Sequence, residues 1–343
     1  MPRSYREAGV DLDEAARAVE RIARAAASTR TPGVLAGVGG FAGLYRFEPT
    51  THPDPVLVAS TDGVGTKLKV AVAAGRFDTV GIDLVNHCLN DVAVTGADPL
   101  FFLDYVGTGR LRAERVEELV GGVAAACAAA GVALLGGETA ELPDLYSGDD
   151  FDLVGTMVGV AARADLIDGS TVRADDVLLG LPSSGLHTNG YSLARRILPE
   201  ATWGDAMPGN GKTVGEVLLE PHRSYLDEIR LLRRALRAAS GDIGALAHLT
   251  GGGWVENIPR TLPAGLGVQV ESGSWSVPPI FTLIQAGGDI ADEEMVRTFN
   301  LGIGLTAVVA RELADAACAA LPEATVVGRV VEVPPGAPRV GFV

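Results

Sequence analysis

The sequence has 343 residues, 47 % of them hydrophobic, and its 43 acidic and 28 basic side chains give a formal net charge of −15. This length fits two domains or one large domain with a substantial core, and the hydrophobic content excludes a disordered chain. The acidic charge argues against a general nucleic-acid binder, so any phosphate recognition must be local. No apolar run reaches the roughly 18 residues that a membrane helix needs.

The N-terminus and the cysteines indicate the compartment. Residues 1–15 contain no apolar signal core, which predicts a cytoplasmic protein. Cys88, Cys127 and Cys318 lie far apart in segments with helical periodicity. Their spacing fits neither a disulfide framework nor a metal site, so we expect buried free thiols.

The first half of the chain alternates helical and strand patterns, interrupted at 33–47 by a glycine-rich stretch with little periodicity. Gly75 and Gly131 are typical helix ends. The predicted elements, in chain order, are a helix at 11–27, a strand at 55–61, helices at 65–75 and 80–96, a strand at 99–106, a helix at 112–131, and strands at 132–137 and 151–162.

A polar stretch at 163–176 predicts a domain boundary. We therefore expect an N-terminal domain at 1–168 and a C-terminal domain at 169–343. The second half shows no sequence repeat of the first, but it also mixes strands and helices, so the predicted fold class is α/β of the mixed α+β kind. Its predicted elements are a strand, a Ser/Gly loop and a helix over 177–198, a helix at 225–239, a glycine turn and helix over 248–262, and a strand, helix and strand over 300–333.

Carboxylates occur at the ends of predicted apolar strands and within a predicted apolar helix. Asp62 ends the strand at 55–61, Asn90 and Asp91 lie on an apolar helix, and Glu138 follows the strand at 132–137. A buried carboxylate is costly unless it is paired or bound to a cation, and Mg²⁺ is usually held by a couple of carboxylates plus phosphate oxygens. The pattern favours a Mg²⁺–nucleotide site. N-capping is the alternative for Asp62 and Glu138, but not for the mid-helix pair.

Lysine is used sparingly in this chain. It occurs only at Lys67, Lys69 and Lys212, and the first two directly follow a glycine-rich turn. A compact ammonium suits a phosphate held close to the backbone, where a planar guanidinium would be too wide. The alternative is that Lys67 caps a turn and that Lys69 is a solvated helix residue.

Three glycine-rich turns precede predicted helices: GVGTK at 63–67, SSGLHTNG at 183–190 and TGGGW at 250–254. Such turns offer N–H groups and a positive helix end to an anion. GVGTK is not a P-loop, because the order of residues differs. Each turn alone is compatible with ordinary turn chemistry, whereas together they indicate two or more phosphate groups.

His187 lies in the second of these turns. We expect it on a loop at a sheet edge rather than in the core, where it could donate to phosphate, act as general acid or base, or cap a turn. Ser184 lies nearby, but no G-x-S-x-G elbow supports a hydrolase.

Eight segments, in order along the chain, closely resemble phosphoribosylformylglycinamidine cyclo-ligase, the family also called aminoimidazole ribonucleotide synthetase. The resemblance runs from Ser4 to about Gly304. The segments are SYREAGVDLDEA, GVGGFAGLYRF, STDGVGTKLKVA, GIDLVNHCLNDVAVTGADPLFFLDY, GGETAELPDLY, SSGLHTNGYSL, AHLTGGGWVENIPR and EEMVRTFNLGIG.

The resemblance implies a two-domain synthetase fold in which the N-terminal sheets of two subunits join into a barrel across a homodimer. It implies ATP and Mg²⁺ at the N-terminal domain and a nucleotide substrate between the domains, with no nucleic-acid or membrane partner. The reaction would be the ATP-dependent ring closure of formylglycinamidine ribonucleotide to 5-aminoimidazole ribonucleotide, releasing ADP and phosphate in purine biosynthesis.

The resemblance also assigns roles to residues of this chain. The implied catalytic residues are His187, Lys67 and Asn189. The implied nucleotide-binding residues are Asp62, Gly63, Gly65, Thr66, Lys67, Asn90, Asp91, Gly137 and Glu138, and the implied metal ligands are Asp62, Asp91 and Glu138. The implied substrate or phosphate residues are Ser183, Ser184, Gly185, Thr250, Gly251, Gly252 and Gly253.

The chain departs from the family pattern at a few positions. His222 stands where the family's Leu-Leu-x-Pro-Thr-Arg has threonine, Leu186 replaces the commoner proline, and Ala23 stands where a lysine is frequent. Two rival interpretations remain: another ATP-dependent enzyme of the superfamily, such as a small-molecule kinase or the preceding amidine-forming synthetase, and a non-catalytic nucleotide-binding homologue.

Overall fold

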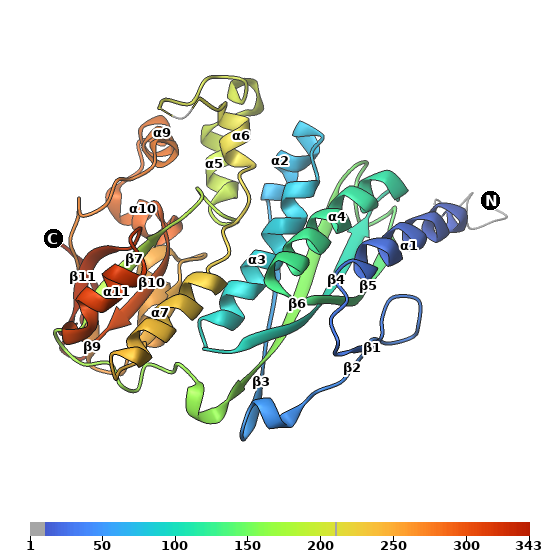
Figure 1. The fold of residues 1–343 in the computed structure, drawn as a ribbon. Coiled ribbons are helices and arrows are strands. Elements are labelled where there is room, and N and C mark those ends of the chain that lie inside the picture. The colour runs from blue at the N-terminus through green and yellow to red at the C-terminus, as the bar shows by residue number, and fades with distance from the viewer. Residues whose placement is uncertain (1–10, 210) are drawn as a thin grey trace. The chain divides into compact units, whose positions relative to one another are not determined.

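The computed structural model describes residues 11–209 and 211–343, so part of the first family-like segment, residues 4–10, lies outside the described chain. The described residues form two compact units (Figure 1). Unit 1 takes 11–92 and 97–164, and unit 2 takes 93–96 and 165–343. The division at 164 and 165 falls within the polar stretch that predicted a boundary.

Unit 1 is a four-stranded sheet with helices on one face. The strand order is β3-β6-β4-β5, in which β4 and β5 are parallel and the other pairs antiparallel. A separate antiparallel pair is formed by β1 and β2. The elements of unit 1 are α1 Leu12–Ala27, β1 Val34–Ala36, β2 Leu44–Tyr45, a 3₁₀ helix Pro49–Thr51, β3 Pro55–Gly63, α2 Lys67–Ala74, α3 Asp78–Ala93, β4 Asp98–Thr108, α4 Ala113–Ala130, β5 Ala133–Glu141, β6 Phe151–Ala162 and a 3₁₀ helix Arg163–Asp165 that ends in unit 2.

The ends of these helices follow from the sequence. The Asp11 side chain accepts from the backbone N–H groups of Asp13 and Glu14 and so caps α1. Gly75 and Gly131 end α2 and α4 in the left-handed conformation, with φ of 63° and 70°. The helices and strands predicted in this half are confirmed, with ends shifted by a few residues.

The core of unit 1 lies between the sheet and its helices. α3 is buried almost all round, as its apolar sequence indicated; Leu84, Val85 and Leu89 are fully buried. α3 and α4 touch through their backbones, because a Cβ on Gly122 would lie 2.0 Å from the Asp78 carbonyl oxygen. Cys88 and Cys127 are buried and Cys318 is partly buried, and all three are free thiols. Burial raises the pKa of the first two, which keeps them protonated.

The other face of this sheet is partly open. Along β3 the exposed positions alternate with covered ones, and Leu57 is 68 % exposed. Val154, Thr156 and Val158 of β6 and Tyr105 of β4 lie on the same face and are half-buried. An antiparallel sheet usually covers one face with core and leaves the other to water, but here the second face is largely apolar.

Unit 2 contains a six-stranded sheet in the order β12-β9-β11-β7-β10-β8, in which only the edge pair β12–β9 is parallel. Its apolar core includes Trp254, which stacks on Trp275 with ring centroids 5.0 Å apart. The elements are β7 Val177–Pro182, α5 Tyr191–Ile197, a 3₁₀ helix Glu200–Thr202, α6 Val214–Leu218, α7 Leu226–Ala238, β8 Ala245–His248, α8 Gly253–Asn257, a 3₁₀ helix Ile258–Thr261, β9 Leu266–Val270, α9 Pro279–Gly288, α10 Asp292–Thr298, β10 Ile303–Val309, a 3₁₀ helix Arg311–Leu313, α11 Ala314–Ala320, β11 Thr325–Glu332 and β12 Val340–Phe342.

The pairing of β10 decides where the loops of unit 2 emerge. β10 is antiparallel to β7 on one side and to β8 on the other, so β7 and β8 run in the same direction. Their carboxyl ends therefore lie at the same edge of the sheet, one strand apart. Both predicted anion-binding loops of this half begin at that edge.

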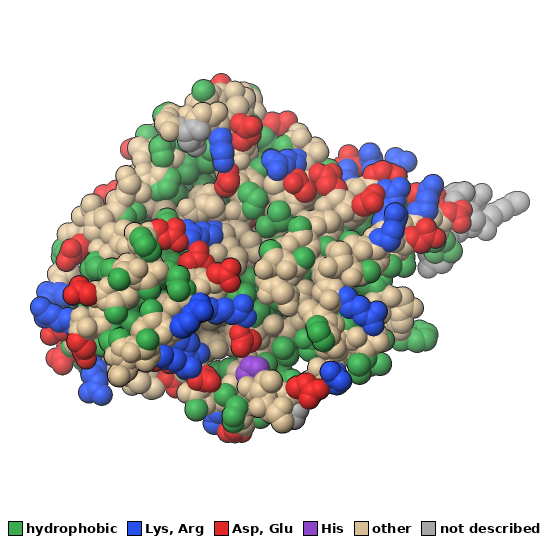
Figure 2. Space-filling model, in the orientation of Figure 1, with side chains coloured by type: hydrophobic (Ala, Val, Ile, Leu, Met, Phe, Trp, Pro, Cys, Tyr) green, Lys and Arg blue, Asp and Glu red, His purple; other side chains and the backbone are tan. Residues whose placement is uncertain are grey.

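The surface carries both signs of charge. On the face shown in Figure 2, Lys and Arg side chains are interspersed with Asp and Glu, so that face has no broad basic patch. Within the described chain, no helix combines the length and the apolar character that crossing a lipid bilayer requires.

One acid is buried within the sheet of unit 1. Asp104 of β4 is 8 % exposed, and burial raises its pKa to about 7 from an ordinary value of 3.8. Its carboxylate occupies the space above Gly137 of β5, where a Cβ would lie 2.1 Å from the Asp104 Oδ1. The native state therefore retains a proton at pH values where the unfolded chain has lost it.

We predict that Asp104 makes unit 1 less stable as the pH rises. Between about pH 4 and 7 the native state binds the extra proton, so the free energy of unfolding should fall by roughly 1.4 kcal/mol per pH unit from this group alone. In Asp104→Asn that contribution disappears. The free energy of unfolding of the variant, relative to that of the parent, should therefore increase as the pH rises, which urea unfolding at several pH values measures. Asp98→Asn, at the exposed start of the same strand, is the control. A parent-to-variant difference that stays constant with pH would contradict the prediction.

Candidate functional site

A group of polar side chains lies where β3 faces α3 in unit 1. Ser60 and Asp62 share one side of the strand because they are two residues apart. The Asp62 carboxylate lies 3.1 Å from Nε2 of His87, and the Ser60 hydroxyl donates to the Asp91 carboxylate at 3.1 Å. His87 and Asp91 are four residues apart on α3 and share its face. The structure thus places the predicted ligands Asp62 and Asp91 in one polar group.

The charges of this group keep Asp62 ionised. Burial by itself raises the pKa of Asp62, but the hydrogen bond and the charge of His87 outweigh it, and the pKa is lowered. Burial by itself lowers the pKa of His87, yet Asp62 and the nearby acids raise it overall. Ionised carboxylate oxygens are the ligands that Mg²⁺ prefers. Asp62 and Asp91 therefore fit a magnesium site.

Glu138 lies elsewhere than the sequence indicated. β5 continues beyond it, so Glu138 is inside the strand rather than after its end. A row of paired residues, about 14 Å long, crosses the sheet from β3 to β5. The row is Asp62, Gly155, Asp104 and Gly137. Glu138 follows this row and so points to the opposite face from Asp62. Within one chain Glu138 therefore faces away from any ion held by Asp62, and the three-carboxylate shell stays a prediction.

The N-capping alternative is wrong for both acids. The N-cap of α2 is Thr66, and the Asp62 carboxylate instead accepts the neighbouring N–H of Gly63 at 3.0 Å. Glu138 precedes no helix. Gly65 adopts the left-handed conformation, with φ of 67°, at the tight turn into α2.

Lys67 is completely buried and its ammonium contacts an acid that the sequence analysis did not single out. Nζ lies 2.8 Å from each carboxylate oxygen of Asp83 on α3, and both side chains are fully buried. In this structure the ammonium thus faces Asp83 between α2 and α3, and its contact with phosphate stays a prediction. Lys69 is exposed and pairs with Asp150, as expected of a solvated helix residue.

The two glycine-rich loops of unit 2 approach each other at the edge described above. A Cβ on Gly251 would lie 3.3 Å from the side-chain oxygen of Asn189. The predicted residues of 183–185 and 250–253 thus lie on two neighbouring loops. The helices that follow have only seven and five residues, so their dipoles contribute little. Binding of an anion at these loops would therefore depend on backbone N–H groups and side chains.

Hydrogen bonds fix the shape of the first loop. The Ser183 hydroxyl donates to the Gly185 carbonyl at 2.9 Å, and the Ser184 hydroxyl donates to the Pro221 carbonyl at 2.5 Å. Asn300, just before β10, donates to the same Gly185 carbonyl at 2.9 Å. The serine hydroxyls therefore hold the loop itself.

The second loop is held by one amide. Nδ2 of Asn257 lies 3.2 Å from the carbonyl oxygens of Thr250 and Gly251 and 2.8 Å from that of Gly253. Gly253 has φ of 55°, and a Cβ there would lie 2.1 Å from a carbonyl oxygen of α10. Only glycine fits that close approach.

His187 is in the core, so the expectation that it lies outside was wrong. It is 1 % exposed and has φ of 60°, a strained conformation for a residue with a side chain. Its Nε2 accepts the Ser184 N–H at 3.2 Å, which places the proton of the neutral ring on Nδ1. The ring fits because position 304 is glycine; a Cβ there would lie 2.4 Å from it.

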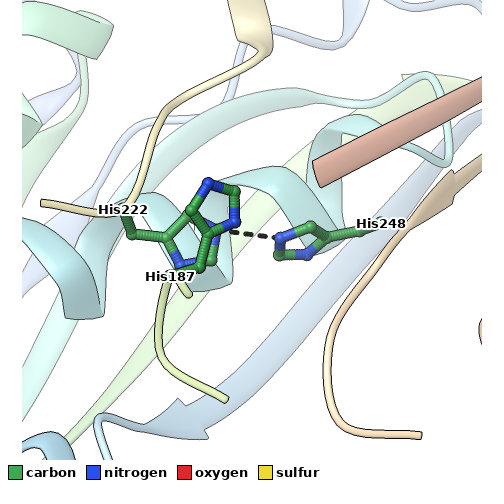
Figure 3. A group of neighbouring side chains, drawn as sticks. All are labelled: His187, His222 and His248. Carbon is green, nitrogen blue, oxygen red and sulfur yellow. Dashed lines mark hydrogen bonds between the residues drawn. The ribbon is translucent and has the colours of Figure 1, made fainter. Parts of the chain in front are cut away.

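Three buried histidines of unit 2 lie together (Figure 3). His187 stacks on His222, with ring centroids 3.9 Å apart and planes 20° apart, and His222 shares a 2.9 Å hydrogen bond with His248. One nitrogen from each of the three rings lies within 4.8 Å of the other two, close enough for a metal. However, lone pairs lie in the ring planes, and the two nearly parallel rings cannot direct theirs to one ion. The cluster is therefore a stacked and hydrogen-bonded group.

Sequence reasoning missed several residues that shape these sites. An acid on an apolar helix was the signal available for Asp83, as it was for Asp91. His248, Asn257 and Asn300 lie within the quoted family-like segments, but nothing in their spacing indicated what they contact.

Comparison with known proteins identifies the family. Residues 39–161 match the model described as AIR synthase related protein, N-terminal domain, and residues 173–341 match AIR synthase related protein, C-terminal domain. The chain belongs to this family. The resemblance drawn from the sequence and the mixed α/β two-domain fold are thereby confirmed.

Curated relatives match over nearly the whole chain. The phosphoribosylformylglycinamidine cyclo-ligase of Sorangium cellulosum is 52 % identical over 341 residues, covering 97 % of each chain. The one of Desulfitobacterium hafniense is 49 % identical over 315 residues, covering 92 % of this chain and 91 % of the relative.

Solved structures of other proteins share the fold of this chain. Thiamine-monophosphate kinase from Stenotrophomonas maltophilia has a TM-score of 0.65 at 18 % identity and covers 95 % of both chains. E. coli HypE has a TM-score of 0.64 at 19 % identity and covers 92 % of this chain and 91 % of its own. At such identities these structures show the fold alone.

We predict that the Lys67–Asp83 pair is required as a pair for stability. Lys67→Met or Asp83→Leu alone leaves one charge buried without its partner, which should lower the free energy of unfolding by about 3–5 kcal/mol. The double variant replaces both charges by apolar groups and should recover most of this loss. Urea unfolding measures it.

Lys69→Met, which breaks an exposed pair on the same helix, is the control and should cost at most about 1 kcal/mol. Single variants as stable as the parent, or a double variant whose loss is the sum of the two, would contradict the interpretation of a buried pair.

Proposed function

We propose that this chain catalyses the ATP-dependent ring closure of formylglycinamidine ribonucleotide to 5-aminoimidazole ribonucleotide, with release of ADP and phosphate in purine biosynthesis. The observation that carries the proposal is the 49 % and 52 % identity, over most of each chain, to relatives named phosphoribosylformylglycinamidine cyclo-ligase. The carboxylate pair of unit 1 and the two adjacent glycine-rich loops of unit 2 support it, since the reaction needs a metal–nucleotide site and sites for further phosphate.

In unit 1 we propose that Asp62 and Asp91 bind Mg²⁺ and that the turn at 63–66 and Asn90 contact ATP. When bound, Mg²⁺ offsets negative charge on the phosphate oxygens during transfer. Lys67 either contacts the phosphate bound by this turn or supports the turn by fixing α2 against α3 through its ion pair with Asp83. The double variant Lys67→Met with Asp83→Leu separates these roles, because it should restore the packing without restoring the ammonium.

In unit 2 we propose that the loops at 183–190 and 250–253 bind the phosphate of the substrate, and that His187 and Asn189 act on the reacting groups. The phosphoryl group of ATP passes to the formamide oxygen of the substrate. The amidine-side nitrogen then bonds to the formamide carbon, the carbon–oxygen bond breaks, phosphate leaves, and one proton is released. The Nδ1–H of His187 is suited to donate to the phosphorylated oxygen, because Nε2 already accepts from Ser184.

We further propose a cytoplasmic homodimer that forms through the open face of the unit 1 sheet. This face carries apolar side chains on three neighbouring strands, including Leu57, Val158 and Tyr105. A contiguous exposed apolar surface is typical of an interface, and a second copy would cover the same residues of its partner. Glu138 lies on this face, so its predicted role would be exercised within the dimer.

The proposed reaction is tested directly with the purified chain. We expect that the substrate, ATP and Mg²⁺ together yield the aminoimidazole product in a colorimetric assay, with one ADP formed per product. Asp91→Asn should fold normally and lose Mg²⁺–ATP binding or turnover by about 10²-fold or more, since phosphoryl transfer depends on charge stabilisation.

Asp78→Asn, at the partly exposed start of the same helix, is the matched control and should keep its activity. ATP consumption without the aminoimidazole product would favour the kinase alternative. Normal nucleotide affinity and turnover in Asp91→Asn would contradict the metal assignment.

The dimer proposal predicts that a charge on the open face separates the subunits. Leu57→Glu should shift the mass measured by light scattering from twice the chain mass towards the chain mass, because a carboxylate would be buried without a partner at the interface. Leu231→Glu, at an exposed leucine of α7 in unit 2, is the control and should remain a dimer. A monomeric parent, or a dimeric Leu57→Glu, would contradict the proposal.

A further inference from the structure

His222 contacts the first glycine-rich loop of unit 2 and the last residue of β8, just before the second loop. Its Nδ1 lies 3.4 Å from the Thr188 hydroxyl of the first loop, and its Nε2 lies 2.9 Å from Nε2 of His248, where β8 enters the second loop. Its ring also stacks on His187 (Figure 3). His222 is 1 % exposed, so these contacts are shielded from water.

The bond between His222 and His248 restricts both rings. A hydrogen bond between two imidazole nitrogens needs a proton on one and a lone pair on the other. If His222 donates, its Nδ1 accepts from the Thr188 hydroxyl and His248 carries its proton on Nδ1. If His248 donates, the Nδ1–H of His222 points to Thr188. Each arrangement fixes one tautomer and one orientation of His248.

The resemblance noted in the sequence implies threonine at the position that His222 occupies here. A threonine hydroxyl ends at the γ position and cannot reach His248, whereas the imidazole extends two bonds further. The neighbouring Asn189 donates to Thr188 at 3.4 Å, so the contacts form a continuous chain from Asn189 to His248. This series of contacts links a predicted catalytic residue to the end of β8, from which the chain continues into the loop of Thr250–Gly253.

We propose that His222 is a positioning residue that holds His248 in one tautomer and orientation at the second loop, and thereby arranges the loop that binds the phosphate of the substrate. The kinetic part rests on the proposed function. The structural part, that His222 fixes the tautomer and orientation of His248, is independent of the proposed function. His222 itself touches no reacting atom in this proposal; it acts through His248.

Two substitutions separate the contacts of His222. A glutamine amide reaches the position of Nε2, and an asparagine amide reaches only that of Nδ1. His222→Gln should therefore retain the bond to His248, whereas His222→Asn should retain only the contact with Thr188. We expect His222→Asn to raise the KM for the nucleotide substrate about tenfold with little change in Mg²⁺–ATP affinity, and His222→Gln to recover most of this loss.

A second readout needs no activity. Nitrogen-15 spectra of the histidine rings report the tautomer of each, and a coupling across the hydrogen bond reports the His222–His248 contact in the parent protein. We expect this coupling in the parent and a single His248 tautomer there and in His222→Gln, but mixed tautomers in His222→Asn. His52→Gln, at a histidine of unit 1, is the control and should change neither the spectra of the cluster nor the KM.

Three results would overturn the proposal: no coupling between His222 and His248 in the parent, unchanged His248 signals in His222→Asn, or an equal rise in KM in both variants. If the variants fail to fold, the parent coupling alone decides. If the parent forms no aminoimidazole product, the proposed function fails, and the ring spectra still test whether His222 holds His248.

Discussion

In unit 1 the fully buried ammonium of Lys67 and carboxylate of Asp83 bind each other at 2.8 Å, and α2 and α3 cannot separate without leaving a charge alone in the core. The same constraint shapes the neighbouring group, where Asp62 faces His87. Burial of charge requires a partner on an adjacent element. The elements that carry the predicted nucleotide residues are therefore held in register by electrostatics as well as by apolar packing.

In unit 2 the corresponding constraint is strand pairing. Because β10 lies between β7 and β8 and is antiparallel to both, two loops distant in sequence leave the sheet side by side. Buried side chains then hold each loop: Asn300 the first and Asn257 the second. The histidine cluster links the first loop to the last residue of β8, just before the second loop. A rigid scaffold that presents short glycine-rich loops is well suited to binding phosphate groups.

The geometry also changes how the acids of unit 1 are understood. Glu138 lies on the open face of the sheet, and Asp62 and Asp91 lie on the helical face, so within one chain these acids are separated by the sheet. Burial raises the pKa of Asp104, which lies in the same row as Asp62, to about 7. Strand order and the alternation of side chains between the two faces decide whether two carboxylates of a sheet lie close together.

The sequence by itself determined the family, the alternation of strands and helices, the glycine helix ends and the polar group on α3, because these depend on local patterns and on long motifs. It also singled out Asp62 and Asp91 as acids in need of a partner. Only the tertiary structure decided that Lys67 faces Asp83, that Glu138 lies apart from Asp62, and that His187 is buried beside His222 and His248. Those outcomes depend on strand order, register and side-chain contacts between distant segments, which no local pattern specifies.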